Sequence, residues 1–135
     1  MSVAVSKFPT GGFLKATITG AASTANGGLG NIPNPEGVDL LILRSYFHAR
    51  TGSTGAANLD VGVAATTATK GTDILSAFDG IEGTVGGKAF YCQAVPVNET
   101  ENAVVWGADE YITVTGSATT VGLDADLYIE YIRLA

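Results

Sequence analysis

The sequence is poor in the side chains that most often carry chemistry. Its 135 residues include one cysteine, Cys92, and one histidine, His48. A single cysteine cannot form an internal disulfide, and a zinc site needs more thiolate or imidazole ligands than these two residues supply. We therefore expect no disulfide framework, no metal site and no cofactor.

Charged residues are also scarce, at 15% of the chain, whereas soluble domains carry about 25%. The seven lysines and arginines are scattered, and the net charge is −6. Binding to phosphates or to anionic lipid needs clustered basic side chains. We therefore expect neither a nucleic acid nor a membrane as partner. A surface of Thr, Ser, Asn, Gly and Ala suits packing against other protein subunits, and the alternative is a slightly apolar monomer.

Long apolar runs are missing too. No stretch approaches the roughly 18 continuous apolar residues that predict a transmembrane helix. Residues 1–12 lack the apolar core and the basic leader of a signal peptide. We expect a protein made in the cytoplasm that leaves it, if at all, by a route such as cell lysis.

What the sequence does have is glycine and alternation. Its 18 glycines are spread along the chain, and apolar residues recur with period two rather than 3.6, which is typical of strands joined by turns. The pattern predicts an all-β fold, an antiparallel β-sandwich or jelly roll, with a closed barrel as the main alternative. Residues 1–12 are predicted to form an N-terminal arm and residues 13–135 a single domain. The strands are expected at 13–19, 38–50, 58–65, 89–95, 104–106, 110–115, 119–123 and 127–134.

Three details of this prediction bear on function. Residues 20–37 are expected to form a long contact loop, because loops of this length are often functional. Residues 73–78 are ambiguous and are interpreted as one helical turn capped by Thr72 or Asp73. Alternation places Leu43 and Ile129 among the inward side chains.

Candidate catalytic groups are few. His48 could join a serine and an aspartate in a triad, but the chain has no strand–turn–helix elbow of the GxSxG type. Cys92 has no basic neighbour that would lower the pKa of its thiol. We interpret His48 as a surface histidine and Cys92 as a buried inert thiol, and we expect no enzyme.

Acidic and aromatic residues leave two alternatives open. Asp124 and Asp126 could supply oxygen ligands to calcium, although solvated acids at strand ends are the simpler interpretation. A glycosidase needs two carboxylates about 5–9 Å apart across a groove, and the aromatics that would line one are scattered. Trp106 and the tyrosines could form a sugar-stacking surface, but core or interface packing is expected for most of them.

The stretch from Asn58 to the end resembles the small virion proteins of tailed phages that decorate or cement the capsid, and the pattern covers about half of the chain. The residues that carry the resemblance are 57–64, 73–75, 106–114 and 127–132. The resemblance implies a β-sandwich that trimerises and binds the major capsid protein on the outer capsid surface. It therefore implies a structural role in the virion, and the alternative is a host- or glycan-binding module of a fibre or head spike.

Partner-binding residues are expected in the arm, in the long loop and among the tyrosines. The arm would make intersubunit contacts that order on binding. The candidates are Val5, Phe8, Pro9, Asn31, Pro33, Pro35, Tyr46 and Tyr128.

Overall fold

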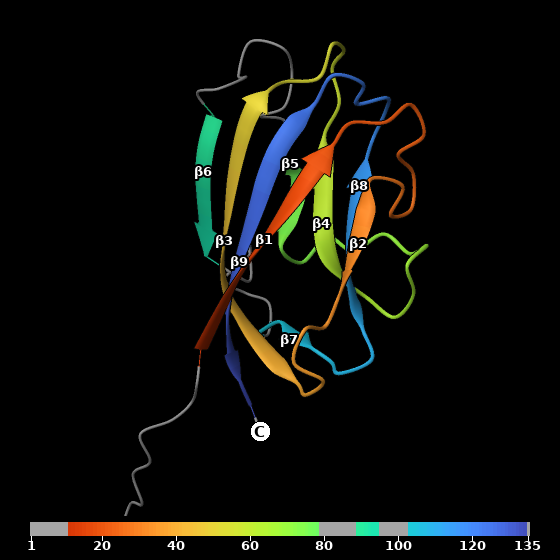
Figure 1. Ribbon diagram of the computed structural model, residues 1–135. Helices are drawn as coiled ribbons and strands as arrows, with labels where there is room; N and C mark the ends of the chain where they lie inside the picture. The colour runs from red at the N-terminus through yellow and green to blue at the C-terminus, as the bar shows by residue number, and fades with distance from the viewer. Residues whose placement is uncertain (1–10, 79–88, 95–102, 135) are drawn as a thin grey trace, which may run out of the picture.

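The structure is a sandwich of two antiparallel sheets (Figure 1). The computed structural model describes the backbone of residues 11–78, 89–94 and 103–134, and the side chains of all of these except 89–94. None of these residues forms a helix. Consequently none forms a helix long and apolar enough to cross a membrane. The predicted all-β sandwich is confirmed.

Sheet A has the strand order β1-β9-β3-β6, and β7 pairs with the start of β3. Its strands are β1 (Gly11–Thr19), β9 (Asp124–Arg133), β3 (Leu40–Thr51), β6 (Ala89–Ala94) and β7 (Val105–Trp106). Sheet B has the order β2-β8-β4-β5. Its strands are β2 (Gly30–Pro33), β8 (Tyr111–Gly116), β4 (Leu59–Ala64) and β5 (Leu75–Phe78).

Apolar side chains from both sheets fill the space between them. Ile129 and Leu127 of β9, Phe47 of β3 and Ile112 of β8 are fully buried there. The predicted inward set of β9 is confirmed, since Leu127, Ile129 and Tyr131 are all buried. Burial of such side chains contributes about 1.5–3 kcal/mol each, which makes this core the main stabilising feature of the fold.

A β-bulge reverses the alternation of β3. Ile42 pairs with Tyr131 and Arg44 with Glu130, so β3 has one more residue than β9 over this step. Ile42 and Leu40 point into the core before the bulge, and Ser45 and Phe47 point into it afterwards. The prediction that Leu43 points inward is wrong, because the inserted residue shifts the phase of the alternation.

The predicted long loop at 20–37 contains a strand. β2 pairs with β8 from Gly30↔Val114 to Pro33↔Tyr111, and Ile32 packs against the core. This short edge strand has little alternation of its own. Its pairing with β8 is a long-range contact that composition does not reveal.

The segment 73–78 contains a strand and not a helical turn, since residues Leu75–Phe78 form β5. β5 pairs with β4 through Leu59↔Phe78 and Val61↔Leu75. Ile74 and Leu75 are both buried, and the segment completes sheet B.

The remaining differences concern boundaries. β1 begins at Gly11, so Gly11 and Gly12 belong to the strand and not to the arm. Residues 119–123 form a turn closed by the Leu123 N–H donating to the Thr120 carbonyl, and not a strand. β9 begins at Asp124, three residues earlier than predicted. Residues 1–10 of the predicted arm lie outside the described residues.

Candidate functional site

The outer face of sheet B lies under the chain's own loops. Thr113 of β8 donates its hydroxyl to the Thr69 carbonyl at 2.7 Å, and Asp73 accepts the Val63 N–H of β4 at 2.9 Å. Lys70 lies 3.4 Å from the Asp60 carboxylate. Asp60 and Thr113 are buried, although they alternate with the core residues of their strands and point away from the core. They are buried because loops cover this side of the sheet.

Glycine allows this cover to lie close to the sheet. A Cβ at Gly62 of β4 would lie 2.4 Å from the backbone carbon of Gly71, which is closer than real contacts allow. A second loop approaches β8, where the Gly27 N–H donates to the Thr115 hydroxyl at 2.8 Å. The loops at 20–29 and 65–74 therefore turn the outer side of sheet B into a second buried layer.

The outer face of sheet A is different, because most of its described side chains reach solvent. We call the outward side chains of β1, β9 and β3 the open face. Phe13 is 57% exposed and Leu43 36% exposed. Figure 1 shows this side of sheet A toward the viewer, with the described loops at its ends. The open face comprises Phe13, Lys15, Thr17, Leu43, Arg44, Tyr46, His48, Arg50, Asp124, Asp126, Tyr128, Glu130 and Ile132.

Three aromatic rings from three strands meet on the open face. The Phe13 ring lies 5.6 Å from the Tyr46 ring and 5.9 Å from the Tyr128 ring, measured between centroids. Tyr46 and Tyr128 are opposite each other in the β3–β9 register. Aromatic groups of this kind are enriched where proteins bind other proteins.

A shallow hollow of about 390 Å³ lies beside these rings. It is lined by Gly11, Gly12, Phe13, Leu43 and Ile132, together with Glu130 and Tyr131. A Cβ at Gly12 would lie 2.2 Å from the end of the Tyr131 ring, so the ring would have to shift to admit one. The bulge supplies the Leu43 side chain to the same hollow. An apolar recess and an exposed ring therefore lie next to each other on the sheet.

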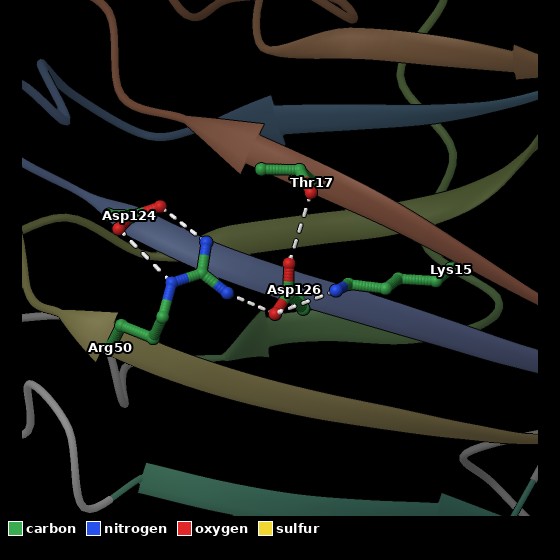
Figure 2. A network of polar contacts seen from close by, with 5 residues as sticks. All are labelled: Lys15, Thr17, Arg50, Asp124 and Asp126. Carbon is green, nitrogen blue, oxygen red and sulfur yellow. Dashed lines mark hydrogen bonds and ion pairs between the residues drawn. The ribbon is translucent and has the colours of Figure 1, made fainter.

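A charged network joins the three strands at the other end of the open face (Figure 2). Arg50 of β3 lies between Asp124 and Asp126 of β9, and its Nε donates to Asp124 at 3.1 Å while another guanidinium N–H reaches Asp126. Thr17 of β1 donates to Asp126 at 3.1 Å, and Lys15 lies 3.7 Å from the same carboxylate. The hydrogen bond from Arg50 lowers the pKa of Asp124, and the bonds to Asp124 and Asp126 raise the pKa of Arg50.

This network changes the interpretation of the acidic pair. The sequence makes Asp124 and Asp126 candidates for calcium binding. In the structure, however, Arg50 and Lys15 pair with these carboxylates and supply the positive charge that a calcium ion would bring. Within the described residues, no group of three or more His, Cys, Asp or Glu side chains could hold a metal ion. The pair works as a cross-strand ion bridge.

The catalytic candidates lie on neighbouring strands of sheet A, with His48 on β3 and Cys92 on β6. His48 is half-buried on the open face and is paired in register with Asp126, whose carboxylate is held by Arg50 and Thr17. The Cys92 backbone pairs with Tyr46, and its side chain lies outside the described residues. Asp109 and Glu110 form a second pair of adjacent acids, and the Glu110 carboxylate accepts the Gly107 N–H at 2.8 Å.

The structure brings together two of the predicted partner residues, Tyr46 and Tyr128. Asn31, Pro33 and Pro35 are exposed, but they belong to β2 and the turn after it. Val5, Phe8 and Pro9 lie outside the described residues. Phe13, Leu43 and Ile132 were missed. The signal for Phe13 was present, because an aromatic residue alternates with Lys15 and Thr17 on the exposed side of β1.

Trp106 is not part of any exposed aromatic surface. Its side chain is fully buried, its indole N–H donates to the Glu110 carbonyl at 3.1 Å, and its ring packs edge-on against Tyr131. The sugar-stacking interpretation therefore loses its strongest residue.

Comparison with known proteins identifies a similar fold. No protein family model and no curated protein matches the chain. Among solved structures, a chain of the cyanophage Pam1 capsid asymmetric unit superposes with a TM-score of 0.58 at 13% sequence identity, covering 98% of this chain and 94% of that chain. The predicted likeness to phage virion proteins is thus confirmed at the level of the fold, over nearly the whole length of both chains.

Proposed function

We propose that this chain is a structural protein of a phage virion. It binds the outer surface of the capsid and stabilises it by bridging subunits of the major capsid protein. The observation that carries the proposal is the fold shared with a capsid chain along almost the full length of both. In this role the chain acts by contact, as a non-enzymatic homotrimer without a cofactor, nucleic acid or membrane partner.

The architecture supports such a role physically. A bridging subunit must transmit force without deforming. Here a filled core holds the two sheets together, and the Arg50 network ties β1, β9 and β3 within sheet A. A bridging subunit must also offer protein-binding area, and the open face supplies aromatic rings, an apolar hollow and polar groups at its rim. This mixture of an apolar centre and a polar rim is typical of protein interfaces.

The experiment is reconstitution on particles. Capsids lacking this protein are mixed with the purified full chain, separated by sedimentation and imaged by cryo-electron microscopy. We expect regularly spaced density on the outer surface, in contact with more than one capsid subunit, and a higher temperature of capsid disruption. Capsids that stay bare at saturating protein would refute the proposal.

A second candidate function is a host- or glycan-binding module. The exposed rings of Phe13, Tyr46 and Tyr128 favour it, since sugars stack on aromatic faces. A glycan array separates the two candidates. Selective glycan binding that is lost on Tyr46→Ala, together with bare capsids, would support the second candidate over the first.

A further inference from the structure

We propose that the open face is the surface through which copies of this chain contact one another. Phe13, Leu43 and Ile132 lie at the centre of that contact. The inference deepens the proposed virion role, because it names the self-contact that a bridging assembly would use. It is argued from charge, shape and size in turn.

Charge favours this face over the rest of the described surface. The open face carries three cationic side chains, Lys15, Arg44 and Arg50, and three acidic ones. The acidic ones are Asp124, Asp126 and Glu130. The described residues include nine acids and five bases, so six acids and two bases lie elsewhere, and an excess of −4 lies outside the open face. Two copies therefore repel each other less through this face than through the rest of the described surface.

Charge also indicates which partner binds the open face. A strongly acidic or strongly basic partner would find no opposite net charge on the open face. A second copy presents the same balanced set, in which Arg44 and Glu130 are register neighbours. Rows of both signs on one surface can pair with the same rows of a symmetry mate.

The shape of the open face also favours a second copy of the chain as the partner. Phe13 protrudes, with 57% of its surface exposed, and the hollow of about 390 Å³ lies directly beside it. A protruding ring and an apolar recess on one patch are complementary to a second copy of that patch. Lys15, Arg44 and Glu130 then form the polar rim.

The area of the open face sets the expected strength of the self-contact. The longest strand of the face, β3, has 12 residues, which at about 3.3 Å per residue and about 4.8 Å per strand gives a flat area of roughly 570 Å² for three strands. Stable interfaces bury about 800 Å² on each partner. The self-contact should therefore be reversible and dependent on concentration. Capsid attachment would strengthen it by holding copies close together.

The test measures mass against concentration. The full chain is studied by sedimentation and light scattering from about 10 μM to about 1 mM, the range that suits a contact of this size. We expect the mean mass to rise above 13.7 kDa for the wild type. Phe13→Asp and Leu43→Asp should stay at the monomer mass throughout the series.

A matched control distinguishes the face from general hydrophobicity. Val121 is 48% exposed but lies in the turn between β8 and β9, outside the open face, so Val121→Asp should associate as the wild type does. Circular dichroism checks that each variant is folded. A wild type that remains monomeric at all concentrations overturns the inference, and so do open-face variants that associate normally.

Parallel binding to capsids separates this inference from the proposed function. A monomeric wild type that still coats capsids overturns the self-contact, and the homotrimer with it, but leaves capsid binding by the chain intact. An oligomer that ignores capsids, and whose mass falls in the Phe13→Asp variant, supports the self-contact and overturns the proposed function alone.

Discussion

The outer faces of the two sheets differ in what covers them. On sheet B, loops at 20–29 and 65–74 bury Asp60, Thr113 and Thr115 and satisfy their polar groups. On sheet A, most of the outward side chains of β1, β3 and β9 reach solvent and gather aromatic rings around a hollow. The outer face of sheet B is covered by loops of the same chain, whereas the outer face of sheet A remains available for contacts with other molecules.

The comparison shows that polarity alone does not identify a binding face. The outer positions of β4 and β8 are Asp, Gly, Ala and Thr, which suit solvent, yet they are buried. Phe13 and Leu43 are apolar, yet they are exposed. The face that is free to bind is the one on which apolar side chains remain after the loops have packed.

The largest expected effect tests which side chains belong to the core. Ile129 is fully buried, so Ile129→Ala should lower the free energy of unfolding by about 2–5 kcal/mol. Leu43→Ala, on the open face, should cost about 1 kcal/mol or less. Urea denaturation measures both, and equal losses would mean that Leu43 is a core residue after all.

The next effect tests the loop cover of sheet B. Gly62→Ala places a methyl group against the Gly71 backbone, so we expect destabilisation of about 1–3 kcal/mol, as for other overpacked sites. Gly55→Ala is the matched control, because a Cβ there meets nothing within 4 Å. Thermal unfolding of the two variants should differ clearly. A silent Gly62→Ala would show that the 65–74 loop is not held against the sheet.

A smaller effect tests the ion network of the open face. Arg50 lowers the folded-state pKa of Asp124 below its ordinary value of 3.8. The resulting stabilisation is present above pH 3.8 and is lost as the pH falls through the lowered folded-state pKa. Asp124→Asn should remove this part of the acid dependence, as followed by urea midpoints from about pH 5 to about pH 2. An unchanged acid profile in the variant would contradict the ion bridge.

The prediction with the smallest expected effect concerns the covered face of sheet B, where the pKa shift of an aspartate has the opposite direction. Burial raises the pKa of Asp73 above 3.8, with the hydrogen bond from the Val63 N–H acting against it. Above the folded-state pKa the charged carboxylate is therefore a mild cost to the native state. Asp73→Asn keeps the acceptor for Val63 and should raise stability near neutral pH by less than about 1 kcal/mol. A clear loss of stability would show that the charge itself stabilises the loop.

Some parts of the candidate site were accessible from sequence and others were not. Tyr46 and Tyr128 stand at polar-side positions of strongly alternating segments, which marked them as contact residues. Leu43 could not be found, because the bulge that exposes it arises from the register between β3 and β9. Strand β2 was missed for a related reason, since its pairing with β8 joins residues about 80 positions apart in the chain.

By itself, the sequence determined a sandwich of antiparallel strands with Leu127, Ile129 and Tyr131 inside, because period-two alternation and glycine-rich turns act over a few residues at a time. Only the tertiary structure decided which outer face is covered, where the phase of β3 reverses and how Arg50 meets Asp124 and Asp126. Alternation states which side chains share a side of a strand. What lies over that side depends on loops and neighbouring strands that approach from distant parts of the chain.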